Sequence, residues 1–194
     1  MSKEIVLDIE TQNTFQEVGK YDHTLLRISL VGAYFYETDT YESFLEHELP
    51  SLWPRLERAE RIVGYNSKGF DLPVMNNYYA GDLLRIPQLD IMEEIQKHIG
   101  FRVKLDDVAH GTLGMGKSGN GLMAVQYFRQ GEMEKLRDYC LQDVKVTKAV
   151  YEHGLAKGEL KYYDNRQGKM VLVPVKFNRN LAETKPAINL TMPF

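Results

Sequence analysis

The chain has 194 residues, with 24 basic and 27 acidic side chains and a formal net charge of −3. Hydrophobic residues make up 43% and charged residues 26%, ordinary values for a folded domain that argue against disorder. A single cysteine excludes a disulfide framework and a cysteine-rich zinc module, and it fits a reduced, cytoplasmic location. No apolar run approaches the roughly 20 residues that a membrane span needs, and the acidic start of the chain does not resemble a signal peptide.

The charge is unevenly distributed. Residues 1–153 carry 17 basic and 24 acidic side chains, whereas residues 154–194 carry 7 basic and 3 acidic ones. Mild overall acidity argues against a protein that coats nucleic acid electrostatically, but not against an enzyme that binds it through metal. We expect one domain over residues 1–153, with residues 154–194 forming a basic hairpin and tail of the same unit.

Hydrophobic periodicity and turn residues predict the elements in chain order. Strands alternate with helices up to residue 153, which favours an α/β layered fold with a central sheet flanked by helices and an appended C-terminal β-hairpin. The predicted elements are strands at 4–10, 25–36, 61–66 and 86–90, helices at 41–61 (interrupted by Pro50 and Pro54), from Asp71, at 90–99, 104–110 and 132–153, a glycine-rich loop at 111–121, and a hairpin at 160–177.

The first strand carries two carboxylates where packing residues are expected. Asp8 and Glu10 are two residues apart and therefore share one strand face with Val6. Like charges about 7 Å apart on a strand cost energy unless a cation or solvent relieves them. A half-exposed polar strand face explains the pair equally well at this stage.

The long helix contains a second unusual acid. Apolar residues at helical spacing form a stripe, and Asp143 is the only carboxylate within it. Tyr139 precedes Asp143 by four residues, so both side chains project from the same helix face. A buried carboxylate needs a hydrogen-bonding partner, a basic partner or a metal ion. Pairing with a tyrosine hydroxyl or a basic residue is the structural alternative.

Asp71 is ambiguous on its own, because an N-cap at the start of a helix explains it without any chemistry. Asp8, Glu10, Asp71 and Asp143 together supply hard oxygen donors suited to Mg²⁺ or Mn²⁺. Four carboxylates can hold two divalent cations, as in in-line phosphoryl displacement. The sequence offers no Cys/His cluster that would compete as a zinc site.

Three segments in order resemble the exonuclease motifs of the DEDD superfamily: the strand 6–11 with Asp8 and Glu10, then Asn66-x3-Phe70-Asp71, then Tyr139-x3-Asp143. That superfamily has a ribonuclease H-like fold and includes the proofreading domains of family-B DNA polymerases and small stand-alone exonucleases. The resemblance covers residues 4 to about 153. Asp138 stands where one branch has histidine, so Tyr139 places the chain in the tyrosine (DEDDy) branch.

The resemblance implies hydrolysis of phosphodiester bonds from a 3′ end with release of nucleoside 5′-monophosphates. Asp8, Glu10 and Asp143 would hold one Mg²⁺ or Mn²⁺, and Asp8 would bridge to a second that Asp71 reaches. Tyr139 would orient the attacking water, since a phenol with a pKa near 10 is a poor base at neutral pH.

Four further residues are candidates for binding the substrate: Thr11, Asn66, Phe70 and Lys117. For Phe70, core packing is an equal alternative, and Lys117 is as readily explained by solvation. The expected partner is nucleic acid, with single-stranded DNA favoured over RNA. The sequence does not indicate a polymerase or helicase partner.

A competing motif runs from Gly111 to Ser118 and satisfies the G-x-x-x-x-G-K-[ST] pattern of a phosphate-binding loop. Such a loop must leave a buried strand and enter a helix. Here the preceding residues are charged and helix-like, and glycines follow, so the context disfavours a nucleotide hydrolase. A catalytically inactive nucleic-acid-binding subunit on the same fold is the third alternative, which the intact acidic set disfavours.

The C-terminal hairpin and tail interleave basic and aromatic residues, a pattern that suits contacts to a nucleic acid backbone and stacking on bases. Packing of the aromatics on the domain, with solvated lysines, is the favoured alternative because the excess positive charge is modest. The residues concerned are Lys161, Tyr162, Tyr163, Arg166, Lys169, Lys176, Phe177 and Arg179.

Overall fold

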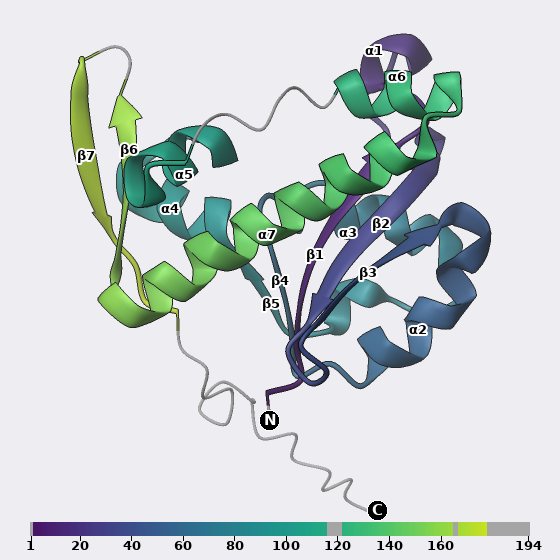
Figure 1. Cartoon of the computed structure of the whole chain (residues 1–194), viewed down its shortest axis with the longest axis horizontal. Coiled ribbons are helices and arrows are strands. Elements are labelled where there is room, and N and C mark those ends of the chain that lie inside the picture. The colour runs from purple at the N-terminus through teal and green to yellow at the C-terminus, as the bar shows by residue number, and fades with distance from the viewer. Residues whose placement is uncertain (1, 116–121, 165–166, 178–194) are drawn as a thin grey trace, which may run out of the picture.

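The computed structural model describes residues 2–115, 122–164 and 167–177. A five-stranded mixed sheet forms its centre, with the strand order β3-β2-β1-β4-β5 (Figure 1). β1 is antiparallel to β2 and parallel to β4; β2–β3 is antiparallel and β4–β5 parallel. The strands are β1 (Glu4–Thr11), β2 (Ile28–Phe35), β3 (Thr40–Leu45), β4 (Arg61–Gly64) and β5 (Gln88–Asp90).

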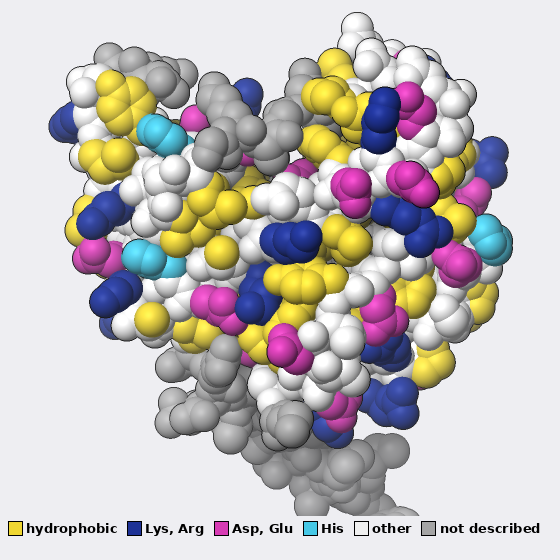
Figure 2. All heavy atoms as spheres, in the orientation of Figure 1, with side chains coloured by type: hydrophobic (Ala, Val, Ile, Leu, Met, Phe, Trp, Pro, Cys, Tyr) yellow, Lys and Arg dark blue, Asp and Glu magenta, His cyan; other side chains and the backbone are white. Residues whose placement is uncertain are grey.

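Helices cover both faces of this sheet. One face packs against α4, α5 and α7, the other against α2 and α3, and α6 lies against α7 (Figure 1). In the space-filling view, the lobe with α5 and the lobe with α1 and α6 are separated by a notch (Figure 2). The helices are α1 (Phe15–Val18), α2 (Leu49–Glu57), α3 (Asp71–Met75), α4 (Ile91–Ile99), α5 (Leu105–Leu113), α6 (Leu122–Gln130) and α7 (Met133–Lys157).

The predicted α/β architecture is confirmed, including the hairpin of β6 (Glu159–Asp164) and β7 (Lys169–Pro174). The predicted helix at 41–61 is wrong in its first part. Residues 40–45 are instead the edge strand β3, because a turn containing left-handed Asp39 (φ 54°) returns the chain along β2. The sequence also gave no indication of α6, which follows the glycine-rich segment.

The hairpin packs on the domain. Leu160, Tyr162, Val173 and Phe177 are buried in the core cluster that also contains residues of α4, α5 and α7. At Gly154 of α7, a Cβ would lie 2.3 Å from the Phe177 ring, so glycine is needed for this close contact. For Tyr162 and Phe177 the favoured alternative, packing on the domain, is therefore confirmed. Arg166 and Arg179 lie outside the described residues.

Across the described parts of the chain, we find no helix with both the length and the apolar character needed to cross a membrane.

Candidate active site

Polar residues gather where β1 and the neighbouring parallel strand β4 end. In open sheets, ligands bind beyond the carboxyl ends of strands, at a point where the connections diverge. A cavity of about 390 Å³ lies here. It is lined by eight of the nine predicted site residues: Asp8, Glu10, Thr11, Asn66, Phe70, Asp71, Tyr139 and Asp143. The ninth, Lys117, lies outside the described residues.

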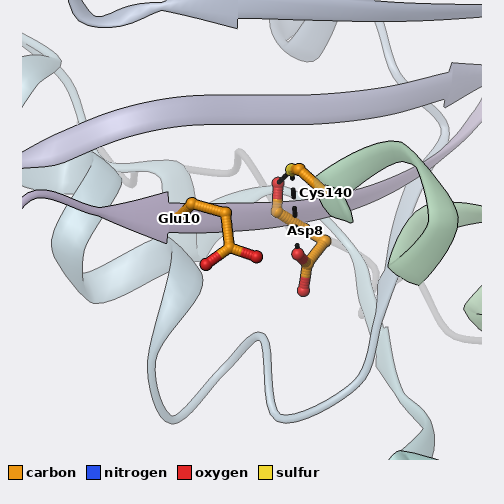
Figure 3. Close-up of side chains that lie close together, drawn as sticks. All are labelled: Asp8, Glu10 and Cys140. Atoms are coloured by element: carbon orange, nitrogen blue, oxygen red, sulfur yellow. Dashed lines mark hydrogen bonds between the residues drawn. The ribbon is translucent and has the colours of Figure 1, made fainter. Parts of the chain in front are cut away.

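Asp8 and Glu10 lie on the face of β1 that α7 covers. Val6 on the same face is fully buried in the core beneath α7, whereas Ile5 and Leu7 pack on the opposite side of the sheet. The two carboxylates and the thiol of Cys140 each offer an atom, and these atoms all lie within 4.8 Å of one another (Figure 3). The predicted sharing of one face is therefore confirmed.

Cys140 is a member of this cluster that the sequence analysis did not single out. Its buried Sγ donates weak hydrogen bonds to the backbone oxygen of Asp8 (3.6 Å) and to Oδ2 of Asp8 (3.8 Å; Figure 3). Burial raises the pKa of the thiol well above its usual value, and the charge of Asp8 raises it further. A protonated thiol is a donor rather than a metal ligand. Its position between Tyr139 and Asp143 in the sequence was the available signal.

Gly32 allows α7 to come this close to the strand. It pairs with Asp8 across β1 and β2. A Cβ at this position would lie 2.8 Å from Sγ of Cys140 and 3.1 Å from Cγ2 of Val144. The missing side chain lets the helix backbone approach the acidic strand.

Asp71 is not the N-cap of its helix. α3 begins at Asp71 itself, and the preceding residue, Phe70, makes no side-chain cap. Oδ1 of Asp71 instead accepts a hydrogen bond from the backbone N–H of Ile9 at 3.1 Å, which holds the carboxylate against β1 between the other two acids. Burial raises the pKa of Asp71 to about 7, and the charge of Asp90 contributes to the increase.

The clustered carboxylates share an electrostatic cost. Burial raises the pKa of Asp8 well above its usual value, and the charges of Asp71, Glu10 and Asp143 raise it further. Burial, then the charges of Asp143 and Asp71, raise the pKa of Glu10 in the same way. Hard oxygen donors that repel one another in a buried site are the donor set that a small divalent cation relieves. The residues present therefore fit Mg²⁺ or Mn²⁺.

α7 supplies the remaining two candidates. Its stripe of buried residues follows the predicted helical spacing, and Leu136 and Cys140 are fully buried. Tyr139 and Asp143 lie at the edge of this stripe, where they are half-buried and line the cavity. Burial raises the pKa of the Tyr139 phenol, and the nearby charge of Asp143 adds to the effect. The phenol therefore keeps its proton at neutral pH and can donate a hydrogen bond.

Asp90 holds the loop that carries Asn66 and Phe70. Asp90 caps α4, where its side chain accepts a hydrogen bond from Glu93 N at 3.2 Å. It also accepts from Asn66 N (2.9 Å) and Lys68 N (3.0 Å), which fixes the left-handed conformation of Asn66 (φ 64°). Phe70 lines the cavity and also packs on the core, so core packing is confirmed and a contact to substrate stays a prediction.

The start of the competing phosphate-loop motif has a packing role. Gly111 and Thr112 lie within α5, so a helix rather than a strand precedes the pattern. A Cβ on Gly111 would lie 2.6 Å from the backbone of β6. The Thr112 hydroxyl exchanges hydrogen bonds with the backbone of Lys161, each at 2.8 Å. The last residues of the motif lie outside the described part of the chain.

Comparisons with known proteins agree with this architecture. The chain is similar to the family B DNA polymerase from the hyperthermophilic archaeon Pyrobaculum calidifontis, with a TM-score of 0.61 and 20% sequence identity. The similarity covers 78% of this chain and 24% of the polymerase chain, so this chain matches only about a quarter of that protein, and such low identity shows a shared fold alone. No curated protein matches. A model of the RNase_H superfamily matches residues 5–154, most of the chain, and the chain therefore belongs to the RNase_H superfamily.

Proposed function

We propose that the protein is a 3′–5′ exonuclease of the DEDDy type that depends on two divalent cations. It would hydrolyse single-stranded DNA from the 3′ end and release nucleoside 5′-monophosphates. One observation carries the proposal: Asp8, Glu10, Asp71, Asp143 and Tyr139, from three separate segments, line a single cavity. Membership of the RNase_H superfamily supports nuclease chemistry at this position, and the fold shared with a DNA polymerase supports DNA as the substrate.

The four carboxylates would hold two Mg²⁺ or Mn²⁺ ions, with Asp8 shared between them. When bound, such cations activate the attacking water and stabilise the leaving oxygen of an in-line displacement. The low solvent exposure of Glu10 and Asp71 supports this role, because charged carboxylates with little access to water require a compensating partner.

The protein's own groups would then orient the reaction. Tyr139, protonated because of its raised pKa, would donate a hydrogen bond that aligns the attacking water. The Ile9 amide keeps Asp71 in place, and the Cys140 thiol does the same for Asp8. Asn66, Phe70 and Thr11 line the same cavity and would contact the terminal nucleotide.

Digestion of labelled oligonucleotides tests the proposal. Matched single-stranded, duplex and mismatched DNA and RNA carry a label at either end and are incubated with Mg²⁺, Mn²⁺ or a chelator. We expect a 5′-labelled single strand to give a ladder that shortens from its 3′ end, and a 3′-labelled strand to release labelled mononucleotide at once. Release that persists with chelator would contradict the metal requirement.

Two variants on α7 separate chemistry from folding. Asp143→Asn should abolish release of mononucleotides, because it removes a proposed cation ligand. Asp138→Asn removes the same charge from an exposed position on the same helix and should leave activity unchanged. Equal activity in both variants would exclude Asp143 from the site. Binding of DNA without cleavage by the native protein would instead favour an inactive binding subunit.

A further inference from the structure

A second cavity, of about 320 Å³, lies between the α4–α5 connection and the C-terminal hairpin. α4 and α5 lie beside the hairpin in the fold (Figure 1). Two aromatic and two basic side chains in its lining are exposed, beside the exposed Gln167: Phe101, Tyr163, Arg102 and Lys104. We refer to these four residues as the aromatic–basic platform.

Both aromatic rings of the platform are open to solvent, and the fold supports the ring of Phe101. Phe101 is 50% exposed, and its ring packs edge-on against the buried ring of Tyr162, with the centroids 6.1 Å apart. Tyr163 is 36% exposed, follows Tyr162 on β6 and lines the same cavity as Phe101. Exposed rings beside one cavity suit stacking of nucleobases, which tolerates any sequence.

The basic side chains of the platform are free to bind an anion. Within the described residues, neither Arg102 nor Lys104 forms an ion pair or a side-chain hydrogen bond. Two acids also line the cavity, but both are engaged by the fold. Asp107 lies in the first turn of α5, where the helix dipole stabilises it. Asp164 accepts the backbone N–H of Gln167 in the hairpin turn at 3.3 Å.

The platform shares a wall with the candidate active site. The backbone oxygen of Val103 accepts a hydrogen bond from the hydroxyl of Tyr65 at 2.7 Å, and Tyr65 lines the active-site cavity. Leu105 lines that cavity as well. A Cβ on Gly69 would lie 3.6 Å from Nη2 of Arg102, so the guanidinium lies beside the loop that carries Asn66. One segment, 101–105, therefore separates the two cavities and contributes to both.

We propose that the aromatic–basic platform binds the single-stranded nucleic acid upstream of the bond being cleaved. Bases several nucleotides from the 3′ end stack on Phe101 and Tyr163, while Arg102 and Lys104 contact the phosphates between them. This inference rests on the proposed exonuclease activity and names the part of the substrate that the active-site cavity does not hold. It predicts that the enzyme acts better on strands long enough to reach the platform.

The length dependence of hydrolysis provides the test. One variant combines Phe101→Ala with Tyr163→Ala, a second combines Arg102→Ala with Lys104→Ala, and kcat/KM is measured on oligo-dT strands of 2, 3, 6, 10 and 15 nucleotides. We expect each variant to match the wild type on the dinucleotide and to lose about 10-fold or more on the 15-mer, the size of one or two lost stacking contacts. Equal losses at every length, or no loss on the 15-mer, would overturn the proposal.

A matched control uses another exposed aromatic–basic pair. Tyr41 is 37% exposed on β3, and Lys145 of α7 lies over its ring at 5.7 Å. The combined Tyr41→Ala and Lys145→Ala variant removes the same kinds of groups and should retain wild-type length dependence. A loss on the 15-mer equal to that of the platform variants would refute a specific binding surface.

A binding measurement tests the platform independently of the proposed exonuclease activity. Fluorescence anisotropy of labelled 15-mer dT with each protein in chelator measures affinity without cleavage. We expect both platform variants to bind at least 10-fold more weakly than the wild type, and the basic variant to show a shallower salt dependence. Weaker binding without any hydrolysis by the wild type would reject the activity and keep the platform. Unchanged binding would reject the platform alone.

Discussion

Replacing Asp71 with asparagine should stabilise the metal-free protein at high pH. The folded-state pKa of Asp71 is about 7, above the ordinary 3.8, because burial disfavours the charged carboxylate. Between these two pH values the folded state binds a proton that the unfolded state has already released. Folding stability from this group is therefore complete at low pH and is lost as pH rises towards 7. Asparagine has no such charge and keeps an oxygen for the Ile9 amide.

The size of the effect follows from the pKa shift. The rise from 3.8 to about 7 corresponds to at most about 4 kcal/mol at pH 8, since one pKa unit is about 1.4 kcal/mol. About one third of this stabilising free energy is already lost at pH 5. The free energy of unfolding of Asp71→Asn relative to the wild type should therefore increase by up to about 3 kcal/mol between pH 5 and pH 8.

Urea unfolding of both proteins at pH 5 and pH 8, in chelator and in excess Mn²⁺, measures this difference. Mn²⁺ at 100 times its Kd should stabilise the wild type at pH 8 by about 2.7 kcal/mol, and it should stabilise the variant much less because one proposed ligand is absent. The reasoning would be refuted by a variant that is destabilised equally at both pH values, or by one that gains as much stability from Mn²⁺ as the wild type.

Three other substitutions test separate parts of the structure. Tyr139→Phe should keep the fold and lower kcat on single-stranded DNA by about 10- to 100-fold, less than loss of a proposed cation ligand, because only a water-orienting hydroxyl is removed; an unchanged kcat would exclude that role. Gly32→Ala should lower the free energy of unfolding by about 1–3 kcal/mol and reduce activity, because its Cβ would lie 2.8 Å from Sγ of Cys140; wild-type values in thermal unfolding and digestion would contradict this. Glu4→Gln should cost about 3–5 kcal/mol in urea unfolding by leaving the buried Arg61 without its charge partner, and a cost below 1 kcal/mol would show that the pair contributes little.

The sequence predicted those parts of the fold whose cause is local. The alternation in β1, the helix predicted at 90–99 and the apolar stripe of α7 each depend on neighbouring residues, and each matches the structure. The sequence predicts a helix where the structure has the strand β3. This strand forms because it pairs with β2, and a turn at Asp39 sets that pairing. Pairing with another strand therefore determines the secondary structure here, and the apolar spacing of residues 41–61 carries no information about that pairing.

The sequence predicts which carboxylates line the candidate site, but not which residues hold them in position. A carboxylate within an apolar pattern stands out in a sequence, because burying a charge costs free energy and is therefore uncommon. The groups that position them act through contacts between distant segments: the Ile9 amide on Asp71, the Cys140 thiol on Asp8 and the opening at Gly32. Residues of these types are common, and apart from the position of Cys140 between Tyr139 and Asp143, nothing in their spacing marks them. Likewise, the exposed Phe101 joins the hairpin surface only through the packing of α4 and α5 beside it.

One face of β1 carries both a paired carboxylate and two of the proposed metal ligands. Glu4, Asp8 and Glu10 all project towards α7, yet only Glu4 meets a cation: Arg61 from β4 pairs with it, and the Tyr151 hydroxyl of α7 donates to it at 2.7 Å. Within the described residues, no basic side chain pairs with Asp8 or Glu10. The fold thus neutralises an acid on this face where it can place an arginine, and it leaves the other two beside a cavity. Selection for stability alone would favour removing such a pair, so its presence is consistent with the proposal that a cation from solution binds there.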